Sequence, residues 1–177
     1  MDSFEIRDIL STFRIIADTR EQRTPRAEER FQSFGVPVER ATLSYCDYCG
    51  QITLPGGALY DTGSAIKPAC CIERKMSLDE LAACFTRSRD RFRREFERAS
   101  EAGAKIYLLI ENGSWEAIIK HRYRSRYNET AFKASLTAWV VRYGIVPLFC
   151  KANTSGELIR EILYRDMKER LERGEYG

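Results

Sequence analysis

The chain has 177 residues, of which 44% are hydrophobic and 31% are charged, and its formal net charge is +3. This balance is typical of one globular domain with an adequate core. No apolar run approaches the about 18 residues of a membrane span, and the acidic N-terminus lacks the apolar core of a secretion signal, so we expect no membrane association. We expect an intracellular protein, in the cytoplasm of a prokaryotic-type host or in the nucleus of a eukaryote.

The N-terminal part of the chain predicts a short helix, buried strands and a hairpin. Apolar side chains recur at loosely helical spacing over residues 4–13, and residues 14–19 are typical of a buried strand. Residues 20–40 are rich in arginine and glutamate and contain two prolines, which indicates a loop with some helix. Strand-like runs at 41–49 and 58–62 flank Pro55-Gly56-Gly57, so we expect a hairpin or a bent ribbon there.

From residue 69 onward, predicted strands and helices alternate. After a strand at 69–75, Ser77 and Glu80 have the spacing of a capping box and open one amphipathic helix that ends near Gly103. The remaining elements are a strand, a helix, a strand and a helix, at residues 105–111, 128–143, 145–150 and 154–172. The alternation predicts a single α/β domain over residues 1–177, with its core at about 14–172 and helices packed on a central sheet.

Six cysteines raise the question of a structural metal. Cys46, Cys49, Cys70 and Cys71 could supply four thiolates to a zinc ion. However, adjacent residues of a strand point to opposite faces, which is poor geometry for one tetrahedral site. We therefore favour small buried residues over a zinc site, and reduced thiols over disulfides in an intracellular chain.

Three predicted strands carry acidic residues, namely Asp18, Asp47 and Glu73. Lys75 lies two residues beyond Glu73, so both side chains share one face of a strand. Metal-dependent phosphodiester hydrolysis uses these residue types, because Mg²⁺ (or Mn²⁺) takes carboxylate oxygens, water and phosphate as ligands. A nearby lysine can orient the water or neutralise charge. The alternative is that these acids form ordinary salt bridges.

The order of these residues resembles the XPF-type structure-specific endonucleases. The family's signature is a Gly-Asp pair, a variable gap and Glu-Arg-Lys-x3-Asp, preceded by an Asp-x-Arg-Glu strand end. The matching residues here are Asp18-Thr19-Arg20-Glu21, then Asp47, then Glu73-Arg74-Lys75 and Asp79. The resemblance covers residues 14 to 172, and Cys46 stands where the motif has its glycine.

The resemblance implies a restriction-endonuclease-like α/β fold, in which helices flank a central mixed sheet. It implies a metal-dependent DNA endonuclease that acts on branched or junction DNA in repair or recombination, and a homodimer formed through this domain. The implied catalytic residues are Asp18, Asp47, Glu73 and Lys75. The implied metal ligands are Asp47 and Glu73, with Asp18 as a ligand or a neighbouring acid, and the implied substrate-positioning residues are Arg20, Glu21 and Arg74.

Two alternatives to this activity remain. The family's tandem helix-hairpin-helix domain is expected to be missing, because the chain ends soon after its last predicted helix; an exonuclease or nickase acting on unbranched DNA is therefore one alternative. The other is a catalytically silent DNA-binding partner subunit. The presence of Asp47, Glu73 and Lys75 argues against the silent subunit.

Two arginine-rich segments could bind DNA, and arginine makes up 22 of the 29 basic residues of the chain. The segment 120–127 combines four basic residues with two tyrosines and no acid, which predicts phosphate contacts by Lys120, Arg122, Arg124 and Arg126. The arginines at 87–98 form either a second DNA contact or a solvated helix face. Apolar residues of the last two helices could form either the dimer contact or the core; they are Leu136, Trp139, Val140, Ile159, Ile162 and Leu163.

Overall fold

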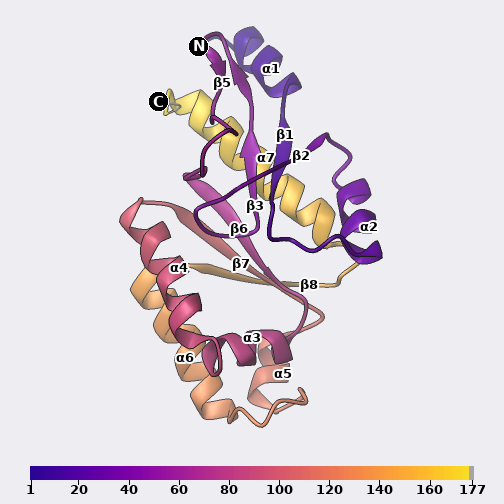
Figure 1. The fold of residues 1–177 in the computed structure, drawn as a ribbon, viewed down its shortest axis with the longest axis vertical. Coiled ribbons are helices and arrows are strands. Elements are labelled where there is room, and N and C mark those ends of the chain that lie inside the picture. Colours follow the sequence, from indigo (N-terminus) through magenta and orange to yellow (C-terminus); the bar gives the residue numbers. More distant parts are fainter. Residues whose placement is uncertain (176–177) are drawn as a thin grey trace.

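A six-stranded mixed sheet forms the centre of the protein in a computed structural model that describes residues 1–175 (Figure 1). The strand order is β2-β1-β3-β6-β7-β8. The strands are β1 (Arg14–Asp18), β2 (Val38–Ala41), β3 (Tyr48–Gln51), β6 (Cys70–Lys75), β7 (Lys105–Glu111) and β8 (Val146–Cys150). The expected α/β fold, a central mixed sheet flanked by helices, is confirmed.

The pairing of the strands brings the predicted acidic residues to one end of the sheet. β1 is parallel to β2 and antiparallel to β3, and β3 is antiparallel to β6, which continues in parallel through β7 and β8. The C-terminal ends of β1 and β6 therefore lie beside the N-terminal end of β3. Backbone hydrogen bonds hold these three strand ends together: Asp18 N donates to Asp47 O at 2.8 Å, and Asp47 N donates to Ile72 O at 2.9 Å.

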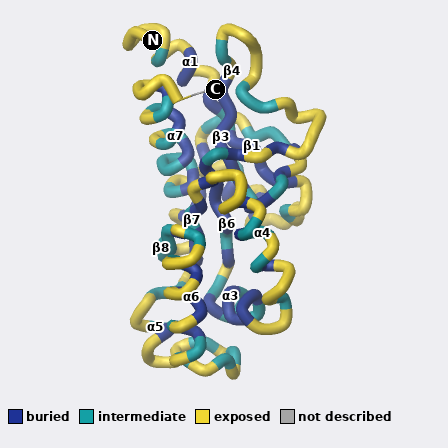
Figure 2. The backbone as a smooth tube through the Cα atoms, turned by 90° about the vertical axis from the view of Figure 1, so that its left-hand side faces the viewer, coloured by how far each residue is buried: buried dark blue, intermediate teal, exposed yellow. Residues whose placement is uncertain are grey.

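Helices cover both faces of the sheet and bury one hydrophobic cluster on each (Figures 1 and 2). One face carries α1 (Ser3–Ser11), α2 (Pro25–Ser33) and α7 (Ser155–Arg173). The other face carries α3 (Leu78–Phe85), α4 (Arg89–Glu101), α5 (Trp115–Ile119) and α6 (Glu129–Tyr143). Within residues 1–175, none of the helices combines the length and apolar character that crossing a bilayer demands.

The single helix predicted after Ser77 is wrong, because the chain leaves the helix between α3 and α4. Thr86 ends α3, and its hydroxyl donates back to Ala82 O at 2.8 Å, a local hydrogen bond that competes with helix continuation. The break lets the rings of Phe85 and Phe92 both reach Trp139, with centroids 5.2 and 4.7 Å from the indole. Tertiary packing of aromatic rings thus overrides the helical pattern.

The strand predicted at 41–49 is also interrupted. β2 ends at Ala41 and β3 begins at Tyr48, because Cys46 has a φ of 63°, a left-handed conformation that no strand contains. A hairpin is present at the expected turn, but its strands are the short β4 (Thr53–Leu54) and β5 (Gly57–Ala58), which pair in antiparallel fashion, and the strand expected at 58–62 does not continue beyond Ala58. The helix expected within 20–40 is α2, whereas β2 and α5 were not predicted.

Candidate active site

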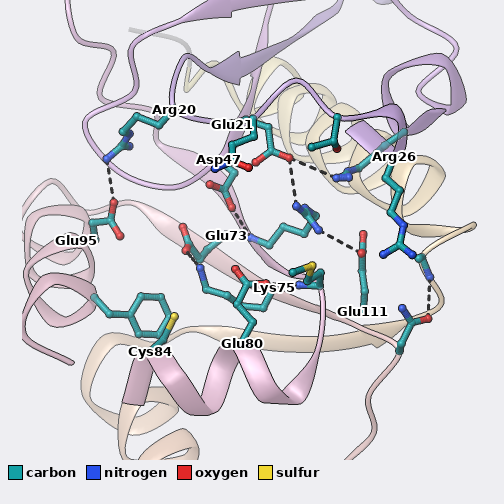
Figure 3. Close-up of a pocket in the computed structure, with 18 of the residues that line it drawn as sticks. Arg20, Glu21, Arg26, Asp47, Glu73, Lys75, Glu80, Cys84, Glu95 and Glu111 are labelled. Atoms are coloured by element: carbon teal, nitrogen blue, oxygen red, sulfur yellow. Dashed lines mark hydrogen bonds and ion pairs between the residues drawn. The ribbon is translucent and has the colours of Figure 1, made fainter. Parts of the chain in front are cut away.

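A pocket of about 1320 Å³ opens at the end of the sheet where β1, β3 and β6 meet. Residues from these strand ends, from α2, α3 and α4, and from the segments after β7 and β8 line it. Figure 3 shows Asp47, Glu73 and Lys75 between two ends of this pocket, with Arg20 and Glu95 at one end and Arg26 at the other. Asp47 and Glu73, two of the three acidic residues predicted at strand ends, therefore face one solvent-accessible space together with Lys75, whereas Asp18 is buried and does not line it.

Asp47, Glu73 and Lys75 are held by the backbone of β6 and by each other. Asp47 Oδ2 accepts a hydrogen bond from Arg74 N at 2.8 Å, which fixes its carboxylate against β6. Glu73 and Lys75 point to the same face of the strand and form an ion pair, with residue exposures of only 3% and 8%. The ammonium of Lys75 also lies 4.9 Å from the ring centre of Phe92, so α4 closes over it.

The charges of this cluster do not balance. Burial, and then the negative charge of Glu73, raises the pKa of Asp47 to about 8. Burial likewise raises the pKa of Glu73, although Lys75 opposes this shift. Burial lowers the pKa of Lys75, but the two carboxylates outweigh it and raise that pKa above its ordinary value. One ammonium therefore faces two carboxylates in a largely dry site.

This donor set fits a hard divalent cation. Mg²⁺ is held in enzymes by one or two carboxylates and completes its shell with water and substrate phosphate. Asp47 and Glu73 supply two such carboxylates. Lys75 alone does not neutralise both of them, and a divalent ion would supply the missing positive charge. Across residues 1–175, no group of three or more histidine, cysteine or acidic side chains is placed to hold a metal, so a fully enclosed protein site is not formed.

The described residues also form no zinc site from the cysteines. Cys46, Cys49 and Cys71 lie in the cluster beneath α3 and α4, whereas Cys70 lies in the cluster beneath α7. The adjacent residues Cys70 and Cys71 thus point to opposite faces of β6, as the strand geometry predicts. The cysteines are free thiols, and five of the six are buried as small core residues.

Asp18 has contacts that differ from those expected of a metal ligand. Its Oδ1 accepts from Arg20 N and from Arg20 Nε, both at 2.7 Å, and its Oδ2 accepts from Leu43 N at 2.7 Å. This hydrogen bonding, with the negative charge of Asp18, raises the pKa of Arg20 despite partial burial. Arg20 Nη1 then reaches Glu95 on α4 at 3.1 Å. Asp18 therefore fixes Arg20 at one end of the pocket.

Arg74 and Glu21 belong to a second ionic network, which lines the same pocket as the carboxylate pair. Glu21 Oε1 accepts from Arg74 Nη2 at 3.2 Å, from Arg30 Nη2 at 3.3 Å and from the Tyr48 hydroxyl at 2.9 Å. Arg74 Nη1 reaches Glu111 Oε2 at 3.2 Å. Because its guanidinium is tied between two acids, Arg74 braces the end of β6, whose backbone holds Asp47.

The predicted basic segment is exposed but lies outside the pocket. Lys120, Arg122, Arg124 and Arg126 are all exposed in the loop between α5 and α6, and the described residues that line the pocket include none of them. Asp79 anchors this loop, since its carboxylate accepts from Ser125 N at 2.6 Å and pairs with Arg124 Nε at 3.5 Å. The two tyrosines of the segment pack inward against Phe132.

Several pocket residues had no place in the sequence prediction. Glu111 ends a buried strand with a carboxylate, a signal available from the sequence that was not used. Glu95 was not singled out, and the arginines at 87–98 were expected to form either a second DNA contact or a solvated helix face; the fold shows that Glu95, Arg91, Arg94 and Arg98 of α4 border the pocket. Arg26 lies in a segment expected to be mostly loop, and no pattern in the sequence connects it with the strand ends.

Comparisons with known proteins agree with this fold. The profile of the ERCC4 domain matches residues 17–162. The solved structure of XPF from Aeropyrum pernix superposes with a TM-score of 0.60 at 22% identity, covering 88% of this chain and 68% of that one. The structure of XPF from Aeropyrum pernix in complex with DNA superposes with a TM-score of 0.59 at 24% identity, covering 89% of this chain and 66% of that one. A search of curated protein sequences finds no match.

Proposed function

Because the chain belongs to the ERCC4 domain family, we propose that it is a metal-dependent DNA endonuclease whose reaction centre is Asp47, Glu73 and Lys75. The observation that carries the proposal is the convergence of these three side chains in one open pocket, where the buried Glu73 carboxylate and the half-buried Asp47 carboxylate face a single ammonium. Branched or junction DNA is the proposed substrate, and repair or recombination is the proposed setting.

The chain's own residues account for binding and orientation in this reaction. Asp47 and Glu73 would hold Mg²⁺ or Mn²⁺, which when bound supplies Lewis-acid stabilisation of the developing phosphate charge and lowers the pKa of water. Lys75 keeps its proton at neutral pH, because the carboxylates raise its pKa. It therefore acts as a positive charge and hydrogen-bond donor toward the phosphate or the attacking water, and not as a general base.

The surrounding residues have positioning roles in this proposal. Arg74, held between Glu21 and Glu111, fixes the end of β6 and so the Asp47 carboxylate. Arg20, held by Asp18, presents a guanidinium at one end of the pocket. We assign Asp18 to this positioning role and leave Asp47 and Glu73 as the two protein ligands.

Variants of the reaction centre test the proposal. Asp47→Asn and Lys75→Ala should each lower kcat about a hundredfold or more, as expected for lost charge stabilisation at a reacting centre. Binding of DNA in EDTA should change little. Matched controls are Asp8→Asn and Lys67→Ala, which alter exposed residues outside the pocket. Cleavage by Asp47→Asn at the wild-type rate would contradict the assignment.

A homodimer through the β8 side of the domain is the second part of the proposal. Of the six apolar residues considered for the contact, Leu136, Trp139, Ile159 and Leu163 are buried in the protomer's own core, so only Val140 and Ile162 remain partly exposed. The surface instead offers the edge strand β8, whose five residues are all half-buried. Exposed edges and apolar side chains of this kind are suited to pairing with a second copy.

The dimer is tested by light scattering, with Val141 as the diagnostic residue. Val141 lies on α6, which leads into β8, and is 85% exposed. The wild type should have about twice the protomer mass of 20.5 kDa, and Val141→Glu should return it to the protomer mass. Phe4→Glu on α1, a similarly exposed apolar residue, is the control. A wild type of protomer mass at micromolar concentration would refute the dimer.

A further inference from the structure

The pocket is bordered by arginines to which the proposed reaction gives no role. Arg91, Arg94 and Arg98 line the pocket and lie on α4, the helix that carries Glu95. Arg26 of α2 lies at the end of the pocket opposite Glu95 (Figure 3). A polyanion that contacts both sets must pass over the carboxylates and Lys75 between them. The arrangement therefore defines a path across the reaction centre as well as a basic surface.

The three α4 residues, here called the groove arginines, form one exposed face of the helix. They are spaced by three and four residues, whereas Phe92 and Phe96 bury the opposite face against the core. Within residues 1–175, Arg91 and Arg94 have no acidic partner within 4.0 Å, and Arg98 donates only to the carbonyl of Ser44 at 3.2 Å.

Other arginines near α4 are used differently. Arg93 pairs with Asp90 and Glu97 along the helix, at 3.8 and 2.8 Å. Arg89 donates to the carbonyl of Phe85 at 3.2 Å and to Ser135 at 3.4 Å, which fixes the break between α3 and α4. Arg89 and Arg93 thus have structural partners, whereas the three groove arginines, which lack acidic partners, border the pocket.

We propose that the groove arginines, together with Arg26, bind successive phosphates of the DNA strand to be cut and guide it over Asp47, Glu73 and Lys75. The inference rests on the proposed nuclease function and adds the path of the substrate. At a helical rise of about 1.5 Å per residue, Arg91 and Arg98 lie about 10 Å apart along α4. Three successive phosphates of one strand span two steps of about 3.4 Å along the duplex axis, or about 7 Å, a length that three long arginine side chains spread over about 10 Å of helix can reach.

The proposal replaces the basic loop at 120–126 as the main DNA contact. That loop is outside the pocket, and Asp79 partly neutralises it through Arg124. The two segments make competing predictions, because each carries at least three exposed arginines and can lose three charges without disturbing the core. Phosphate contacts of either segment would appear in the salt dependence of binding.

The test compares two triple variants with equal loss of charge. The first changes the groove arginines Arg91, Arg94 and Arg98 to glutamine, which keeps helix propensity, and the second changes Arg122, Arg124 and Arg126 to glutamine. A remote triple variant at Arg7, Arg165 and Arg173, on α1 and α7, controls for net charge. Binding of fork, duplex and single-stranded DNA is measured in EDTA from 50 to 300 mM salt, and kcat and KM are measured with Mn²⁺.

On duplex DNA, the plot of the logarithm of the binding constant against the logarithm of the salt concentration should be shallower for the groove variant by about 2.7 units, at about 0.9 per phosphate contact. The variant should also bind every sequence about tenfold or more weakly at 0.1 M salt. Its KM should rise while kcat at saturating DNA stays within a few-fold of wild type. The loop and remote variants should keep the wild-type slope. If the triple groove variant has a lowered thermal midpoint, Arg91→Gln with Arg94→Gln gives the same test with an expected loss of about 1.8 units, since both side chains lack ion-pair partners.

Failure of the inference and failure of the function give different results. Wild-type cleavage with unchanged slope and KM in the groove variant, or loss of slope in the loop variant alone, overturns the inference and leaves the nuclease assignment standing. If the wild type binds DNA but never cleaves it, and the groove variant loses that binding, the nuclease assignment is refuted and the phosphate path is supported.

Discussion

Replacing Asp47 by asparagine should stabilise the metal-free protein. The carboxylate lines the same pocket as Glu73, and burial followed by the charge of Glu73 raises its pKa from 3.8 to about 8. A carboxyl group whose pKa is higher in the folded state destabilises that state when it ionises. This cost is absent below the unfolded pKa of about 3.9, grows as the pH rises, and is complete above about 8.

The size of the effect follows from the shift. About four pKa units, at about 1.36 kcal/mol each, set an upper limit of about 5 kcal/mol. Because Asp47 is partly exposed, solvent screens part of this energy, and we expect about half, or about 2–3 kcal/mol. For a domain of this size about 1 kcal/mol moves the thermal midpoint by about 2–4 °C, so Asp47→Asn should unfold about 5–10 °C above the wild type at pH 8.5.

The assay is thermal unfolding in EDTA between pH 5 and pH 8.5. Asparagine can still accept the hydrogen bond from Arg74 N, so the substitution removes charge with little change of shape. The gain over the wild type should shrink to about 3 °C or less at pH 5, and Asp8→Asn on α1 should show no such trend. Adding Mg²⁺ or Mn²⁺ should stabilise the wild type, by about 2.7 kcal/mol at a hundred times Kd, and should stabilise Asp47→Asn much less. A variant that is no more stable than the wild type at any pH would refute the electrostatic reasoning.

Two further pairs of substitutions test the scaffold around the site by thermal unfolding. Gly156→Ala should destabilise by about 1–3 kcal/mol, because a Cβ there would collide with Ser33 Oγ and lie 2.9 Å from the carbonyl oxygen of Arg30, whereas Gly56→Ala meets open space and should be neutral. Equal thermal midpoints for Gly156→Ala and Gly56→Ala would mean that α2 and α7 can move apart to accommodate the added methyl group at little cost. Cys46→Gly should stay within about 1 kcal/mol of the wild type, since the φ of 63° suits glycine, while Cys46→Val should lose more than about 2 kcal/mol. A valine tolerated as well as glycine would show that this turn carries no strain.

Period-two geometry and the order of the motif residues were enough to predict much of the site from the sequence. Glu73 and Lys75 share a face of β6 because side chains alternate along a strand. The conformation of Cys46 explains how a cysteine can stand where the family motif has glycine: it adopts the left-handed backbone that glycine takes readily, at a cost that the surrounding turn must offset.

The parts that the sequence did not predict depend on tertiary contacts. The break between α3 and α4 serves the packing of Phe85 and Phe92 around Trp139, which no local pattern encodes. The positioning role proposed for Asp18 depends on tertiary contacts, because Leu43 N and the Arg20 side chain both donate hydrogen bonds to its carboxylate. The basic loop had a stronger local signal than the groove arginines, but only the fold determines which arginines border the carboxylates.

The central claim is tested most directly by cleavage of end-blocked DNA, because only an endonuclease cuts a strand that offers no free end. Labelled flap, fork, four-way junction and linear duplex substrates with protected termini are incubated with the wild type in Mg²⁺, in Mn²⁺ and in EDTA. We predict internal cuts with either metal, strongest on the branched substrates, and none in EDTA. Undiminished cutting in EDTA would contradict the assignment of Asp47 and Glu73 as the ligands of a catalytic metal, and no cutting of any end-blocked substrate with either metal would contradict the endonuclease activity.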